Sequence, residues 1–117
     1  MLAVGGHLLG DAVPPIRLAT PFGGGIGSTH EEVCGAIAGG VLIIGALHGR
    51  DRPDQAEEKE RAADLAARYR EGVLSALGDT RCQPLRDRHH GSDGSGTCAP
   101  VVESAAAVLL RILMEES

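Results

Sequence analysis

The chain has 117 residues, the length of one ordinary domain, with no room for a second catalytic domain. Its formal net charge is −5 and its aromatic residues are one Phe and one Tyr. An acidic chain with so few rings has neither the basic surface nor the stacking platform of a nucleic-acid-binding protein. The 17 glycines favour closely packed helices over a β-sandwich. We therefore predict one all-α domain over residues 1–117, a small helical bundle around a buried Gly/Ala-rich central helix.

The cysteines, Cys34, Cys82 and Cys98, are three in number, so at least one thiol is free or pairs outside the chain. Met1 leads directly into a Gly-interrupted apolar stretch without a basic segment, so we expect no signal peptide and a cytoplasmic location. In that compartment cysteines are more often catalytic, redox-sensing or metal-binding than structural.

The first third of the chain is rich in glycine. We expect a short helix over residues 1–10, a turn or helix over 14–18, and then a loop containing Gly23, Gly24 and Gly25. Backbone N–H groups of these three glycines are candidates for binding an anion or cofactor, although tight backbone packing is the favoured interpretation. The Gly-Lys-Ser/Thr ending of a P-loop is absent from this segment.

Two overlapping capping-box patterns, 28–31 and 29–32, predict that a helix starts directly after the glycine loop. Its stretch over 34–47 is apolar on every side, which predicts the buried central helix. The uncharged stretch 33–47 is shorter than the roughly 20 residues needed to span a membrane, so we expect no membrane partner. Small residues that would let a neighbouring helix approach closely are Gly35, Gly39, Gly45 and Gly49.

The second half predicts two further helices. The first runs from about Asp51 to Leu77, stops at Gly78, and has a buried face at helical spacing. That face comprises Ala62, Leu65, Ala66, Tyr69, Val73, Ala76 and Leu77. The polar stretch between Cys82 and Cys98, with its glycine-rich part His89–Gly96, is expected to be a loop. The last helix begins near Cys98, and its apolar face comprises Val101, Ala105, Val108, Leu109, Ile112 and Leu113.

Each cysteine has two interpretations. Cys98 lies where a helix N-terminus stabilises a thiolate. Cys82 and Cys98 enclose a loop that a disulfide could close, with a stabilisation of about 3 kcal/mol from loop entropy, or they are two unrelated surface thiols. Cys34 is expected about one and a half turns into its helix, where the dipole lowers its pKa only weakly. It is a reactive thiol or simply a small buried apolar side chain.

A metal site is the other chemistry that these residues suggest. Cys82, Cys98, His89 and His90 supply donors within a short segment, and Cys34 adds a third thiolate for zinc or an iron–sulfur cluster. The Cys-x-x-Cys spacing of a typical zinc site is absent, and a solvated loop explains the segment equally well.

The segments Phe22–Gly27, Glu32–Gly39 (Glu-Val-Cys-Gly-Ala-x-x-Gly) and Ile44–Gly49, followed by two isolated cysteines, resemble the C_GCAxxG_C_C family. The resemblance extends from about residue 2 to 113. Of the four cysteines in the family pattern, the last three correspond to Cys34, Cys82 and Cys98. The first has no counterpart, which implies either a start codon placed too late or a lost cysteine. The resemblance implies redox or metal chemistry at the cysteines and indicates no substrate.

Three hypotheses follow, in order of preference. The first is a thiol protein in which Cys82 and Cys98 cycle between dithiol and disulfide with an unknown redox partner. Cys98 is the attacking thiol, and Cys34 is a buried resolving or relay thiol close by. The second is a metal carrier or sensor that uses Cys34, Cys82, Cys98 and His89 or His90. The third is a self-associating helical scaffold with inert thiols. A homodimer is expected, since a domain of this size gains core by pairing.

Overall fold

The computed structural model describes residue 18, residues 20–92, residue 94 and residues 96–115. Its helices are η2 (Thr20–Phe22), α3 (Gly35–His48), α4 (Ala56–Leu77), α5 (Cys82–His89) and α6 (Ala99–Glu115). Strand pairing in the described part is limited to one bridge, between Val33 and Arg81. The predicted all-α bundle is therefore confirmed. The helix expected over 1–10 and most of the turn expected over 14–18 lie outside the described residues.

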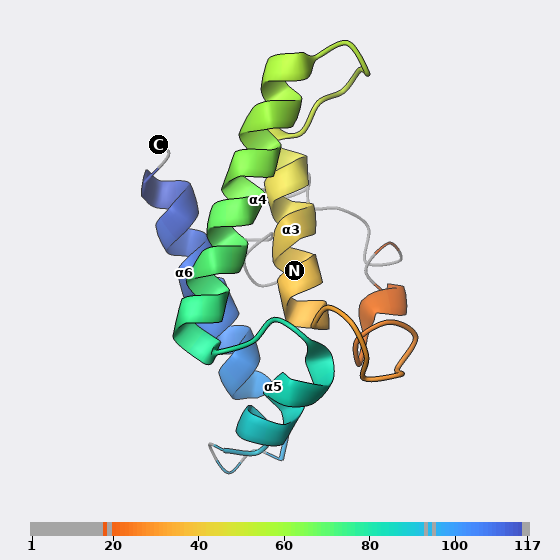
Figure 1. Ribbon diagram of the computed structural model, residues 1–117, viewed down its shortest axis with the longest axis vertical. Coiled ribbons are helices and arrows are strands. Elements are labelled where there is room, and N and C mark those ends of the chain that lie inside the picture. The colour runs from red at the N-terminus through yellow and green to blue at the C-terminus, as the bar shows by residue number, and fades with distance from the viewer. Residues whose placement is uncertain (1–17, 19, 93, 95, 116–117) are drawn as a thin grey trace.

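The core lies between α3, α4 and α6, which pack against one another along their lengths (Figure 1). The whole predicted apolar face of α6 is buried. On α4, Leu65, Tyr69, Val73 and Leu77 are buried as predicted, whereas Ala76 is exposed. Helix α3 is less central than predicted, because Val41 and the 45–47 segment are exposed to solvent. Within the described residues, we find no helix with the length and apolar character needed to cross a membrane.

The close approach of α3 and α4 depends on Gly40. A Cβ added at this glycine would lie 2.6 Å from Cζ of the buried Tyr69 ring, which occupies the space that a side chain would need. By contrast, a Cβ at Gly45 would meet nothing within 4 Å. The prediction that Gly45 lets a neighbouring helix approach was therefore wrong, and the glycine that does so, Gly40, was not predicted.

The start of α3 differs from the sequence prediction. The left-handed region, with φ of 59°, holds three residues of this segment, Ser28, His30 and Glu32. A right-handed α-helix cannot contain residues in this conformation. The Thr29 hydroxyl organises this loop instead, since it accepts the Glu31 N–H and donates to the Ile26 carbonyl. The capping-box prediction was therefore wrong, and the helix begins only at Gly35.

The remaining helices show one late start and one helix that was not predicted. Helix α4 begins at Ala56, later than predicted, because the Gln55 side-chain oxygen accepts the backbone N–H groups of Asp51 and Arg52 in a preceding turn. It ends as predicted, with Gly78 at φ 85°. Helix α5 replaces part of the predicted loop. It buries only Cys82 and Leu85, too few apolar residues to show a helical period.

Candidate thiol site

The three cysteines line one pocket of about 410 Å³. Its lining comes from the starts of α3 and α6 and from α5, and these segments lie at the same end of the bundle (Figure 1). Cys34 directly precedes α3, Cys82 is the first residue of α5, and Cys98 directly precedes α6. The structure thus brings together all three thiols that the sequence predicted as site residues. The described residues that line it are Gly23, Gly24, Gly25, Cys34, Gly35, Ala36, Cys82, Arg86, His90, Gly96, Thr97, Cys98, Val101 and Val102.

A pair of backbone hydrogen bonds fixes Cys34 relative to Cys82. The Cys34 N–H donates to the Thr80 carbonyl at 2.9 Å, and the Cys82 N–H donates to the Glu32 carbonyl at 2.8 Å. This is the pattern of a short antiparallel ladder around the Val33–Arg81 bridge. Two thiols that are distant in the sequence are therefore held by main-chain contacts rather than by side-chain packing alone.

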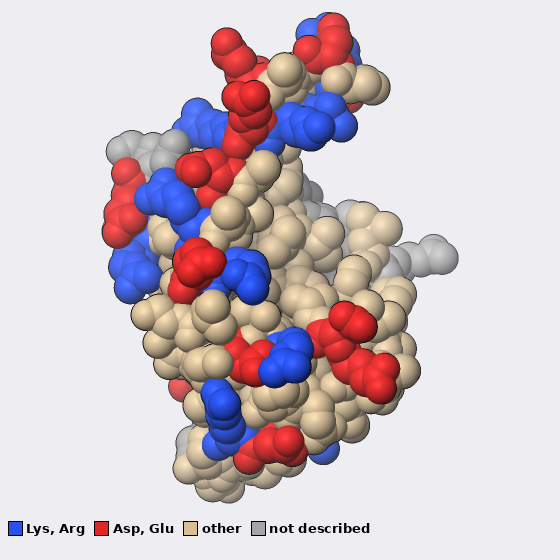
Figure 2. Space-filling model, in the orientation of Figure 1, with Lys and Arg blue, Asp and Glu red and all other residues tan. Residues whose placement is uncertain are grey.

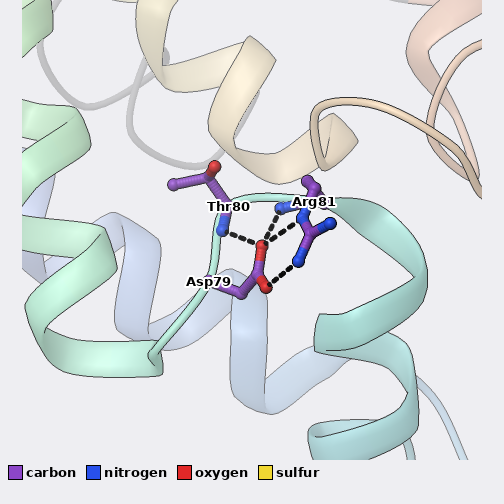
Figure 3. A network of polar contacts seen from close by, with 3 residues as sticks. All are labelled: Asp79, Thr80 and Arg81. Atoms are coloured by element: carbon purple, nitrogen blue, oxygen red, sulfur yellow. Dashed lines mark hydrogen bonds and ion pairs between the residues drawn. The ribbon is translucent and has the colours of Figure 1, made fainter.

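The turn before Cys82 is held by the Asp79 carboxylate (Figure 3). One carboxylate oxygen accepts the backbone N–H groups of Thr80 at 2.7 Å and Arg81 at 2.8 Å. The Arg81 guanidinium donates to both oxygens, from Nε at 3.0 Å and Nη2 at 2.8 Å. The Arg81 hydrogen bonds hold the pKa of Asp79 far below its usual range. This network positions residues 80–82, which pair with residues 32–34.

Replacing Asp79 by asparagine is expected to lower Tm at neutral pH and to change the acid dependence of stability. Because folding lowers the Asp79 pKa, its contribution is present above the unfolded pKa of about 4 and is lost as pH falls toward the folded value. Thermal unfolding followed by circular dichroism between pH 7 and pH 2 should show that Tm falls less on acidification in the variant than in the wild type. Asp54→Asn, at an exposed position, is the control. An equal fall in Tm on acidification in Asp79→Asn and the wild type would contradict this role.

The glycine loop forms one wall of the pocket. Gly25 has φ of +83°, and a Cβ there would lie 2.5 Å from the Glu31 carbonyl oxygen and 3.2 Å from Cβ of Cys82. The carbonyls of Gly23 and Gly24 accept hydrogen bonds from the N–H groups of Ser28 and His30. Close backbone packing beside Cys82 accounts for these contacts, and anion binding by Gly23, Gly24 and Gly25 stays a prediction.

Burial dominates the ionisation of two of the thiols. It raises the pKa of Cys34, although the N–H groups of Ala36 and Ile37 oppose it, and a thiolate at Cys98 raises it further. Burial also raises the pKa of Cys82, to which thiolates at Cys34 and Cys98 add. The predicted position of Cys34, well inside a helix, was wrong. Cys34 instead lies at the N-cap of α3, where the backbone N–H groups lower its pKa, but desolvation has the larger effect and the pKa is raised.

Cys98 differs from the other two cysteines because it is only half-buried. We expect iodoacetamide at pH 7 to label Cys98 first, since alkylation requires an accessible thiolate. Raising the pH should accelerate labelling of Cys34 and Cys82, because their raised pKa values delay thiolate formation. Peptide mapping after timed labelling measures all three rates, and protein unfolded in urea provides the control. Faster labelling of Cys82 than of Cys98 in the folded protein would contradict the assignment.

The metal hypothesis finds little support in this geometry. Across the described ranges, no group of three or more His, Cys, Asp or Glu side chains is arranged to hold a metal ion. His89, a predicted ligand, places its Nε2 3.3 Å from the Leu77 carbonyl oxygen and is not among the lining residues, whereas His90 is. All three cysteines are free thiols.

Two residues near the site were not predicted to lie there. Arg86 lines the pocket from α5, a helix whose apolar period is too weak to be recognised. Tyr69 is buried in the core, and burial followed by a charge at Cys34 raises its pKa. The helical spacing predicted that this tyrosine is buried, but it did not indicate that the side chain lies near Cys34.

Comparison with known proteins places these features in a family. The sequence matches, over residues 3–112, the family model described as "Putative redox-active protein (C_GCAxxG_C_C)". The chain belongs to this family. No curated protein and no solved structure matches it.

Proposed function

We propose that the chain is a thiol–disulfide protein whose reactive pair is Cys82 and Cys98, with Cys34 as a neighbouring thiol. The observation that carries the proposal is the shared pocket. One half-buried and two buried thiols line it, although they come from three separate parts of the chain. The redox-active description of the family agrees with such chemistry.

The proposed reaction has two steps. The Cys98 thiolate attacks one sulfur of a small disulfide, so a mixed disulfide forms and the first leaving thiolate takes a proton from water. The Cys82 thiol then gives its proton to water and attacks Cys98 Sγ, and the second thiolate that this releases takes up a proton. The protein dithiol is oxidised by two electrons to a disulfide, and the small disulfide is reduced to two thiols.

The assignment of Cys98 as the attacking thiol rests on exposure, since solvent reaches it more readily than the other two. Cys82 is assigned the second step because Arg86 lowers its pKa against the larger effect of burial. A neighbouring cation favours the thiolate that this step requires. Cys34 has no such cation among the causes that act on its pKa.

The test is to trap the mixed disulfide. Cys82→Ser treated with bis(2-hydroxyethyl) disulfide is expected to accumulate one mercaptoethanol adduct, located at Cys98 by peptide mapping. The wild type and the matched control Cys34→Ser should instead proceed to a Cys82–Cys98 disulfide without a lasting adduct. Trapping in Cys34→Ser but not in Cys82→Ser would assign the second step to Cys34. Three unmodified thiols in every protein would overturn the proposal.

A further inference from the structure

We infer that the thiol pocket selects small disulfides that carry a carboxylate, and that Arg86 is the residue that binds this group. The inference deepens the proposed function and rests on it, since it names the substrate class of the same site. With about 410 Å³, the pocket has the size of a small-molecule site.

Arg86 belongs to the same helix as Cys82, one of the two reacting thiols. Arg86 follows Cys82 by four residues on α5, so the two side chains lie on the same helix face. Both line the pocket, and the guanidinium is close enough to lower the pKa of the Cys82 thiol. A carboxylate bound by Arg86 would thus hold its attached disulfide beside the thiols.

Arg86 has no carboxylate partner in the described part of the chain, a property it shares with Arg88, but unlike Arg88 it lines the pocket. Arg52, Arg68, Arg70 and Arg81 each form an ion pair with an Asp or Glu. Over α4, acidic and basic side chains likewise lie next to one another (Figure 2). A half-buried guanidinium left unpaired beside a pocket is positioned to bind an incoming anion.

The remaining described walls of the pocket do not oppose a negative charge. No Asp or Glu is among the described residues that line the pocket. Gly35 and Ala36, in the first turn of α3, line it together with the residues before α6, and helix N-termini carry partial positive charge. Apart from the His90 imidazole, the other described side chains that line it are small or apolar. A carboxylate should therefore be favoured, and an ammonium group disfavoured.

The covalent step is that of the proposed function. The Cys98 thiolate forms a bond to one sulfur of the carboxylate-bearing disulfide, its S–S bond breaks, and the leaving thiolate takes a proton from water. Cys82 then displaces the second thiol from Cys98. The carboxylate takes no part in electron transfer, and its contact with Arg86 affects only the positioning of the disulfide.

Three probes test the inference, namely dithiodipropionate with two carboxylates, uncharged bis(2-hydroxyethyl) disulfide, and cystamine with two ammonium groups. Oxidation rates at pH 8, followed by intact mass, are divided by the rates of the same probes with mercaptoethanol. The normalised rate should be highest for dithiodipropionate and lowest for cystamine. Arg86→Gln should lower the ratio of these two rates about tenfold, the effect of one charged hydrogen bond. This ratio is insensitive to a change in thiol pKa alone.

Two further variants separate binding from general charge effects. Arg88→Gln makes the same change in net charge on the same helix but away from the pocket lining, and it should keep the wild-type ratio. Arg86→Lys retains the charge, so it should keep most of the wild-type rate ratio. Equal normalised rates in the wild type, or an unchanged ratio in Arg86→Gln, would overturn the inference and leave the proposed function standing. Failure of all three probes to oxidise any thiol would overturn both.

Discussion

Cys98→Ser is expected to slow the oxidation of the protein by a small disulfide by about tenfold or more at pH 7. The remaining thiols, Cys34 and Cys82, are buried and have raised pKa values. Each unit of raised pKa lowers the thiolate fraction about tenfold, and only the thiolate attacks. The rate is measured by quenching samples with acid and counting free thiols by mass.

The matched comparison is Cys34→Ser, which removes a thiol from the same pocket but leaves the proposed pair intact. It should react within a few-fold of the wild type. If Cys34→Ser is as slow as Cys98→Ser, the buried thiol is the attacking group. If neither substitution changes the rate, the attack occurs outside the proposed site.

Tyr69→Ala is expected to lower the free energy of unfolding by about 3–5 kcal/mol, the usual cost of removing a large buried ring. The side chain is 1% exposed and fills the space between α3 and α4. Tyr69→Phe keeps the ring and should cost only about 1 kcal/mol through the lost hydroxyl. Urea unfolding monitored by circular dichroism measures both changes.

A double-mutant cycle tests the contact itself. Gly40→Ala should destabilise the wild type, because its methyl group would collide with Tyr69. In the Tyr69→Ala background the same methyl group meets empty space, so its cost should fall. A coupling free energy of about 0.5–3 kcal/mol is typical of residues in contact. Additive effects would show that Gly40 and Tyr69 do not share this space.

The long helices were predictable because their apolar residues recur at helical spacing. Helix α6 follows its pattern at every predicted position, and α4 ends at Gly78 as the sequence indicated. The start of α3 was not predictable from its capping pattern, because the loop that precedes it folds back onto Cys82 through Gly25. Such a contact between distant segments overrides a local signal and leaves no mark on the pattern.

The candidate site was predictable in its residue types but not in its arrangement. The cysteines and their family motif identified the thiols. Their convergence depends on the pairing of residues 32–34 with residues 80–82 and on the Asp79 turn, and neither has a periodic signature. Arg86 was missed with α5, since a short polar helix is defined by its tertiary contacts more than by its own sequence.

The central claim is that the pocket thiols exchange with disulfides without a bound metal or cluster. Its most direct test is the intact mass of protein purified without oxygen, recorded under native and denaturing conditions before and after mild oxidation. We expect equal native and denatured masses, and on oxidation the loss of two hydrogen atoms with Cys82 linked to Cys98. Native mass that disappears on denaturation, or three thiols unchanged by oxidation, would contradict the claim.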